Sequence, residues 1–155
     1  LRKMGLPTSA WLSGSSTAMP SVILVSVWKS VGYDTLIFLA ALQGVSASLY
    51  EAARMDSANK VAVFFKITLP MISPQLFFTL IIRTISSFKV FDTVRILTQG
   101  GPNNATTTLV YSIYTEALLN LRIGYSAAIG VILLIIISIL TIIYFWGFSR
   151  KVHYQ

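Results

Sequence analysis

The stretch EAARMDSANKVAVFFKITLP, residues 51–70, is a polar interruption between two long hydrophobic stretches. Ser48 and Glu51 stand in the spacing of a capping box, in which the serine caps the first turn of a helix and the glutamate reaches back to it. Pro70 disfavours helical geometry in the residue before it. The sequence therefore predicts a helix that begins near Ser48 and ends at or before Leu69.

One face of this expected helix is lined by apolar or small side chains at spacings of three and four. These side chains are Tyr50, Ala53, Ser57, Val61 and Phe64, and the charged residues lie mostly on the other faces. The segment is too charged to span a bilayer, so we expect an amphipathic helix outside the hydrocarbon layer. We expect its apolar residues Val61, Phe64 and Phe65 to pack against the chain's own membrane helices.

The composition of the whole chain is that of an integral membrane protein. Of its 155 residues, 55% are hydrophobic and 11% are charged, which is far from the usage of soluble domains. The formal net charge is +7, but the basic residues are scattered singly and no nucleic-acid motif is present. Basic residues in the loops that flank membrane helices account for this charge, and nucleic acid is not an expected partner.

The sequence carries no constellation that points to catalysis. It contains no cysteine, and the single histidine, His153, has no neighbouring carboxylate with which to form a metal or catalytic site. Gly100 and Gly101 are followed by Pro102, which lacks a backbone donor, and no lysine follows at the spacing of a phosphate loop. We interpret the glycines as a turn, and we expect no enzyme activity, no metal and no cofactor in this chain.

Three stretches are apolar enough to form membrane helices, because about 20 apolar residues in a helix cross a hydrocarbon core of about 30 Å. The expected fold is therefore all-α, a polytopic helical bundle in one membrane domain. The expected helices are 19–43, 74–91 and 123–149, with a loop at 1–18, the polar segment at 46–69, a loop with a short helix at 92–122 and a tail at 150–155.

Three charged residues lie inside the expected spans: Lys29 and Asp34 in the first, and Arg83 in the second. Asp34 and Arg83 each lie nine residues from the end of the span that faces the polar segment, which places both about 13 Å into the membrane. A buried ion pair between them is one interpretation, since lipid cannot solvate either charge alone. The other interpretation is that these side chains line a water-filled path, where Arg83 meets a solute.

The polar segment also carries a recognisable spacing, formed by Glu51, Ala52, Ala53, Ser57, Ile67, Leu69 and Pro70. It resembles the EAA loop of ATP-binding-cassette (ABC) importer permeases, the cytoplasmic element that docks onto the ATPase subunit. The resemblance implies that these residues and Asp56 couple the chain to an ATPase. Ser57 stands where the motif usually has glycine, and since serine adopts positive φ less readily, an ordinary helical serine and a left-handed turn are both open here.

The likeness extends to LAALQGVSASLYEAA before the segment and to LTQGGPNNATTTLVYSIYTEALLNLRIGYSAA after it. These stretches are similar to the sugar-type permeases, in particular to the first-permease subunits for maltose, lactose and glycerol 3-phosphate. The resemblance implies the type I importer fold, a multi-pass location in the bacterial cytoplasmic (inner) membrane, and a chain that is the C-terminal part of a permease subunit. It also implies that 1–18 and 92–122 are outer loops, that 46–69 is the cytoplasmic coupling loop and that 150–155 is a cytoplasmic tail.

The resemblance also implies the partners and the class of solute. The implied partners are a separate ATP-binding subunit that hydrolyses ATP, a second permease subunit in a heterodimer, an extracytoplasmic solute-binding protein and the lipid bilayer. The implied solute is a sugar or a related polyol or sugar phosphate. The alternative is a structural or assembly membrane protein, whose polar segment is an interfacial amphipathic helix.

Overall fold

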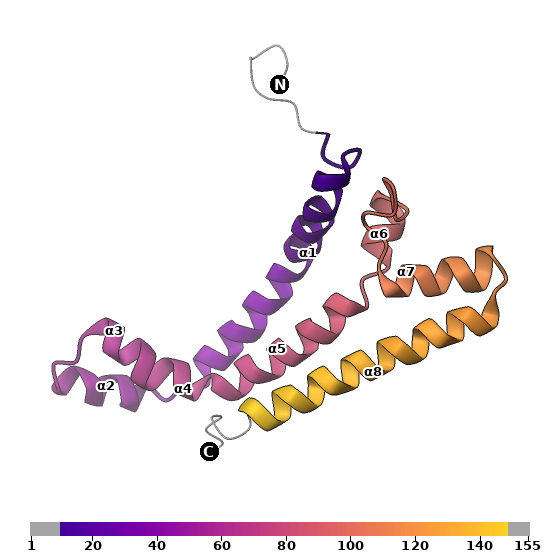
Figure 1. Cartoon of the computed structure of the whole chain (residues 1–155). Coiled ribbons are helices and arrows are strands. Elements are labelled where there is room, and N and C mark those ends of the chain that lie inside the picture. The colour runs from indigo at the N-terminus through magenta and orange to yellow at the C-terminus, as the bar shows by residue number, and fades with distance from the viewer. Residues whose placement is uncertain (1–9, 149–155) are drawn as a thin grey trace, which may run out of the picture. The chain divides into compact units, whose positions relative to one another are not determined.

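The structure is a computed structural model that describes residues 10–148. The expected tail at 150–155, His153, residue 149 of the last expected span and the first half of the expected loop at 1–18 lie outside the described residues. Within the described range the regular elements are helices. In chain order they are α1 (Ser15–Gln43), α2 (Ala47–Met55), α3 (Lys60–Val63), the π-helical turn η2 (Phe64–Thr68), α4 (Leu69–Met71), α5 (Ser73–Phe88), α6 (Asp92–Leu97), α7 (Leu109–Tyr114), the π-helical turn η3 (Thr115–Leu119) and α8 (Ile123–Phe148) (Figure 1).

The described residues fall into two compact units. The first unit holds residues 10–30 and 85–138, and the second holds 31–84 and 139–148, so α1, α5 and α8 each contribute to both. Each unit is described by itself below.

The two longest helices have the length and composition of membrane spans. α1 has 29 residues and α8 has 26, about 40 Å each at 1.5 Å per residue. Large apolar side chains point outward along both, such as Trp28 at 78% and Ile142 at 66% exposure, as lipid contact requires. α1 begins at Ser15 rather than at residue 19, because the amides of Thr17 and Ala18 already bond to the Gly14 carbonyl.

α5 differs from the expected span at 74–91. It runs from Ser73 to Phe88 and has 16 residues, or about 24 Å, which is short for a crossing by itself. The helical stretch Lys60–Met71 precedes it across a 66° bend, and together the two have the length and composition of a broken span or a re-entrant loop. α5 ends before residue 91 because the chain turns toward α7, where the Thr108 hydroxyl donates to the Val90 carbonyl at 2.8 Å.

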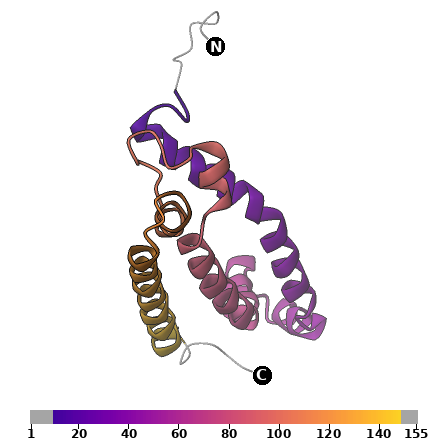
Figure 2. The same cartoon turned by 90° about the vertical axis from the view of Figure 1, so that its right-hand side faces the viewer.

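The first unit is held by a small apolar core. Val22 from α1, Val94 from α6 and Tyr111 from α7 are buried against one another, and Val90, Phe91 and Tyr114 pack around them. Figure 2 shows α6 beside the N-terminal half of α1, where this core lies. In the same unit α7 and η3 lie along the start of α8, and Ser126 donates to the Ile113 carbonyl at 3.0 Å (Figure 1).

The second unit contains the polar segment, and here the expected single helix from Ser48 to Leu69 is wrong. The segment is broken into α2 and a second helical stretch, α3 to α4. The capping box does not form either: α2 begins at Ala47 after Ser46, so Ser48 already lies in the first turn and its hydroxyl is 2.8 Å from that of Ser46. The capping spacing is present in the sequence, but the helix starts two residues earlier than that spacing predicts.

Pro70 does not end the second helical stretch, contrary to the expectation. Thr68 and Leu69 keep right-handed helical geometry, and helix continues to Met71. The residues directly before the proline form the π-helical turn η2, in which the Leu69 amide bonds to the Phe64 carbonyl. A widened turn leaves room for the proline ring, which in a regular helix clashes with the carbonyl four residues earlier. The stretch ends at Ile72, where the backbone leaves helical geometry before α5.

Candidate coupling segment and intramembrane ion pair

α2 presents the first half of the coupling motif outward. Glu51 and Ala52 are exposed, whereas Ala53 is 7% exposed and faces inward. Three residues before Ala53, the Tyr50 hydroxyl lies 3.2 Å from that of the buried Thr68, which ties α2 to the π-helical turn. Ala53 therefore belongs to the contact between α2 and the rest of the second unit, and Glu51 and Ala52 belong to its free surface.

Ser57 adopts the left-handed conformation, with φ of 52°. The Ala58 amide bonds to the Ala53 carbonyl and the Ser57 amide to the Arg54 carbonyl, both at 3.0 Å. This pair of bonds is the Schellman motif, which closes a helix and places a left-handed residue directly after the cap. The usual glycine of the motif suits this position because it has no Cβ penalty at positive φ. The structure thus selects the left-handed turn over the helical serine.

The chain resumes a helix directly after this turn. The Asn59 side chain accepts a hydrogen bond from the Val61 amide at 3.1 Å and caps α3. Asp56 and Ser57 are exposed between the two helices, and Ile67, Leu69 and Pro70 at the far end of the motif are half-buried. The first half of the motif is therefore surface, and the second half is packed within the unit.

The apolar side chains of this segment are exposed, contrary to the expectation that they pack against the chain's own membrane helices. Met55 is 86% exposed, and Val61, Phe64 and Phe65 are 61%, 47% and 60% exposed. The left-handed turn at Ser57 separates α2 from α3. The apolar face expected for one continuous helix, from Tyr50 to Phe64, therefore does not form. Met55, Val61, Phe64 and Phe65 therefore leave apolar surface uncovered on this segment.

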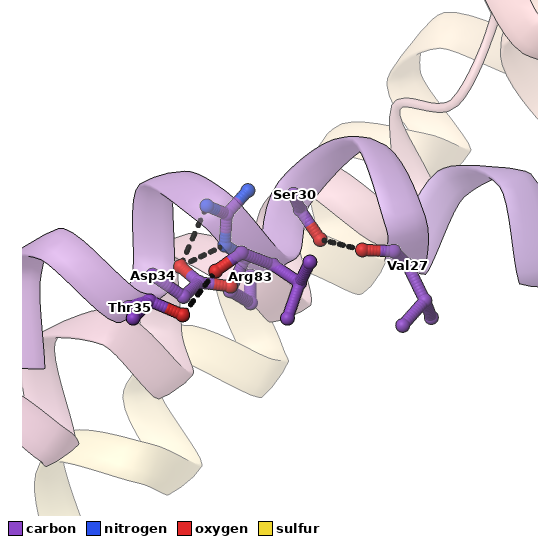
Figure 3. A network of polar contacts seen from close by, with 6 residues as sticks. Val27, Ser30, Asp34, Thr35 and Arg83 are labelled. Atoms are coloured by element: carbon purple, nitrogen blue, oxygen red, sulfur yellow. Dashed lines mark hydrogen bonds and ion pairs between the residues drawn. The ribbon is translucent and has the colours of Figure 1, made fainter.

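Asp34 on α1 and Arg83 on α5 lie against each other in the second unit, as Figure 3 shows. The Arg83 Nε donates to Asp34 Oδ1 at 2.7 Å, and the second guanidinium nitrogen lies 2.6 Å from the same oxygen. The side chains are 33% and 24% exposed, so the pair is mostly withdrawn from the surface. The Arg83 guanidinium also lies 5.5 Å from the centre of the Tyr33 ring.

The hydroxyl groups next to Asp34 on α1 donate to backbone carbonyls and not to the Asp34 carboxylate. Thr35 donates to the Val31 carbonyl and Ser30 to the Val27 carbonyl, so both bond along their own helix (Figure 3). Lys29 is exposed, and it forms no ion pair with another residue in the range 10–148. The structure therefore brings together two of the three expected intramembrane charges and leaves Lys29 outside the pair.

α5 is also fixed to the C-terminal part of α8 in the second unit. Phe77 meets Phe145 edge to face with ring centres 5.7 Å apart, and Thr84 donates to the Tyr144 hydroxyl at 3.2 Å. These contacts join residues about 60 positions apart, so no sequence spacing indicated them. The capping Asn59 is different, because an asparagine directly before a helical pattern is a sequence signal that could have been read.

The fold and these features define an all-α, polytopic membrane protein with an amphipathic, exposed segment between its spans. The chain belongs to the family described as the binding-protein-dependent transport system inner membrane component, whose model matches residues 4–153. The resemblance to ABC importer permeases, drawn from residues 51–70, and the all-α fold class are thereby confirmed. This is a family of permease subunits in the inner membrane.

The chain is also similar to permease proteins of known transport systems. The chain is 46% identical over 144 residues to the sn-glycerol-3-phosphate transport system permease protein UgpA of Yersinia enterocolitica, covering 91% of this chain and 48% of that protein. It is 45% identical over 157 residues to UgpA of Pectobacterium atrosepticum, covering 98% and 52%. The chain therefore spans about half the length of the relatives it matches.

Solved structures share the fold. A chain of a bacterial alginate ABC transporter, in complex with an alginate pentasaccharide-bound periplasmic protein, superposes with a TM-score of 0.85 at 26% identity, covering 97% of this chain and 52% of that one. A chain of a bacterial ABC transporter involved in the import of the acidic polysaccharide alginate gives 0.84 at 26% identity, covering 99% and 54%.

Proposed function

We propose that this chain is the C-terminal part of a permease subunit of an ABC importer that moves a sugar, a polyol or a sugar phosphate across the cytoplasmic membrane. The relatives named for sn-glycerol-3-phosphate transport and the structural neighbours that import alginate support this class of solute. ATP is hydrolysed by a separate subunit, a second permease subunit completes the path, and an extracytoplasmic binding protein delivers the solute.

The observation that carries the proposal is the exposed surface of the coupling segment, residues 46–69. α2 projects Glu51 and Ala52 outward, the Schellman turn at Ser57 ends the helix, and Met55 stands 86% exposed beside it. A short helix with an acidic residue and protruding apolar side chains fits a groove on a partner protein. In this proposal the groove belongs to the ATPase, and Glu51, Ala52, Asp56 and Ser57 line the contact.

The topology follows from the spans. In this proposal α1, α5 and α8 cross the membrane in alternating directions, so the coupling segment and the segment 89–122 lie on opposite sides. The helical stretch Lys60–Met71 then lies on the cytoplasmic side of the 66° bend that precedes α5. The coupling segment faces the cytoplasm, where the ATPase is, and 89–122 faces outward. The packed half of the motif, with Ile67, Leu69 and Pro70, connects the docking helix to α5 and so passes its movement into the membrane.

The Asp34–Arg83 pair has a structural role in this proposal. It joins α1 to α5 inside the second unit, on the two spans that flank the coupling segment, and it removes most of the cost of placing either charge in the membrane. A path-lining role for Arg83 and Lys29 is the other outcome, and the charge-exchange experiment in the Discussion separates the two.

The test is copurification of the ATPase subunit with the complete transporter, and ATP-driven uptake of glycerol 3-phosphate and of a neutral sugar in proteoliposomes. Glu51→Lys places a cation in the docking contact, and we expect at least about a tenfold loss of bound ATPase and of uptake, with membrane insertion unchanged. Asp92→Lys makes the same charge reversal on an exposed residue of α6 in the opposite segment and should leave the ATPase bound.

Two results would count against the proposal. Normal ATPase copurification and uptake with Glu51→Lys would remove the docking role of α2. Absence of any associated ATPase with the unaltered chain would favour a structural or assembly membrane protein.

A further inference from the structure

Arg95, on α6 in the first unit, has a side chain that is exposed yet held in place. Its guanidinium lies 4.5 Å from the centre of the Tyr114 ring and 5.7 Å from that of Phe91. Those two rings are 5.1 Å apart, and each also packs on the buried ring of Tyr111. The guanidinium is therefore held by cation–π contacts with two rings that pack on the core of the unit. Because the side chain is already ordered, it loses less conformational entropy when a ligand binds to it.

This guanidinium has no acidic partner in the described part of the chain. The ion pairs among residues 10–148 are Arg83 with Asp34 and Arg122 with Glu116. Arg122 is a useful contrast, because it also stacks on a tyrosine, Tyr125, at 4.8 Å, but it is neutralised by a carboxylate at 3.5 Å. Arg95 keeps its positive charge and its planar set of donors available.

The loop that follows α6 is rigid and displays further polar groups. Gln99, Asn103 and Asn104 are exposed and all adopt positive φ, between 50° and 58°. The loop is fastened from inside by the fully buried Thr106, whose hydroxyl lies 2.7 Å from that of Thr98 and donates to the Gly101 carbonyl at 2.9 Å. The amide side chains therefore project from a fixed backbone.

The exposed residues of the segment 95–104 are named the Arg95 patch here: Arg95 and Ile96 on α6, and Gln99, Asn103 and Asn104 in the loop that follows it. Ile96 is 77% exposed, which adds an apolar contact to a stacked arginine and three amides. All five residues are exposed, so a small solute would stay largely in water there. A stacked arginine beside an exposed apolar side chain and fixed polar groups is the composition of a protein–protein contact.

We propose that the Arg95 patch is a docking contact for the extracytoplasmic solute-binding protein, with Arg95 pairing to a carboxylate on that protein. The inference rests on the proposed function, which places segment 89–122 on the outer side of the membrane. Charge complementarity selects an acidic surface as the occupant, and the similar alginate transporter was solved in complex with its periplasmic protein. Planar guanidinium groups favour carboxylates because they donate two parallel hydrogen bonds.

The experiment uses the complete transporter in nanodiscs and titrates its purified binding protein while ATPase activity is measured. With Arg95→Gln we expect the binding-protein concentration for half-maximal stimulation to rise about tenfold, with the maximal rate unchanged. Arg95→Lys should give a smaller rise, and the steep salt dependence of the unaltered protein should flatten in Arg95→Gln because a screened charge pair is gone. Arg122→Gln is the matched control and should leave the half-maximal concentration unchanged.

A second measurement does not depend on Arg95. The chain has no cysteine, so Ile96→Cys introduces a single thiol into it. Labelling of this thiol by a membrane-impermeant maleimide should slow at least about fivefold when the binding protein is saturating, since a docked surface excludes the reagent.

Each other outcome contradicts the proposal in a distinct way. An unchanged half-maximal concentration with Arg95→Gln, or unprotected Ile96→Cys, overturns it. An effect of Arg95→Gln that follows the anionic-lipid content of the nanodiscs instead of the binding-protein concentration assigns the arginine to a lipid headgroup. If the unaltered transporter shows no stimulation by its binding protein, the proposed function itself has failed.

Discussion

The two segments that join the spans are stabilised in different ways. Segment 89–122, in the first unit, is built around buried side chains: Val94 and Thr106 are fully buried, and the Tyr111 ring lies against the backbone of Gly100. The coupling segment 46–69, in the second unit, leaves Met55, Val61 and Phe65 largely exposed and is shaped by backbone caps and single polar contacts. The packed loop is stabilised by its own buried side chains, whereas the capped segment leaves apolar surface that the proposed ATPase contact would cover.

The packed loop predicts the largest effect of a single substitution. Gly100 has φ of +82°, and a Cβ there would lie 2.8 Å from both the Tyr111 ring and the Thr107 hydroxyl. Gly100→Ala should therefore lower the free energy of unfolding by about 3 kcal/mol, from backbone strain and overpacking together. The measurement is thermal denaturation of the detergent-solubilised transporter, followed by intrinsic fluorescence.

Gly101→Ala is the control in the same loop. Its Cβ would meet only the Thr98 carbonyl, at 3.3 Å, and its backbone is not left-handed. It should cost clearly less than Gly100→Ala. Equal losses of unfolding free energy for the two variants would mean that Gly100 is not packed against Tyr111 and Thr107. The description of segment 89–122 as a packed loop would then be wrong.

The Asp34–Arg83 pair predicts an intermediate effect in the second unit. Asp34→Asn and Arg83→Gln each leave one partner without its counter-charge, and each should lower the free energy of unfolding by about 2 kcal/mol, less than for a fully buried pair because both side chains are partly exposed. The exchanged pair, Asp34→Arg with Arg83→Asp, should recover part of that loss. Thermal denaturation and the yield of assembled transporter are the measurements.

The second ion pair of the described chain is the control for this experiment. Arg122 and Glu116 lie 3.5 Å apart, and their side chains are 61% and 19% exposed. Arg122→Gln should cost less than Arg83→Gln, because the distance is longer and the arginine is more exposed. Single changes at Asp34 and Arg83 that leave assembly intact but abolish uptake, with no rescue by the exchange, would assign Arg83 to a solute path instead of a structural pair.

The sequence predicted the class of fold and the coupling motif, because both depend on local patterns. Apolar runs long enough for α1 and α8, and the spacing from Glu51 to Pro70, are visible without coordinates. The matched depth of Asp34 and Arg83 also followed from counting residues along two spans. The spans and the depth match need only the rise of a helix and the cost of a charge in lipid. The motif from Glu51 to Pro70 was found by its resemblance to the EAA loop.

The features that sequence reasoning missed depend on contacts between distant residues or on backbone geometry. The cation–π contacts of Arg95 combine Phe91 with Tyr114, which no helical spacing relates. The π-helical turn before Pro70 lets the helix continue through a proline that would otherwise end it. The capping box at Ser48 failed because a second serine, Ser46, stands directly before the helix and takes the cap position. Periodicity drawn across residues 50–64 failed because one left-handed residue interrupts it.

Ser57 gives the smallest predicted effect, and its sign tests the capped side of the comparison. A serine at φ of 52° carries a Cβ penalty that glycine does not, so Ser57→Gly should stabilise the coupling segment by up to about 1 kcal/mol. A serine inside a continuous helix would give the opposite sign, since glycine is worse than serine there by a few tenths of a kcal/mol or more.

Denaturation of the solubilised transporter measures the sign of the change in stability at Ser57. Ser48→Gly inside α2 is the helical control and should destabilise the protein. Because the Ala58 and Ser57 amides close the helix by backbone bonds alone, Ser57→Gly keeps both bonds and changes only the conformational preference of residue 57. Destabilisation by Ser57→Gly would mean that the segment is one continuous helix in the assembled transporter, and the distinction between a packed loop and a capped, partner-completed segment would no longer hold.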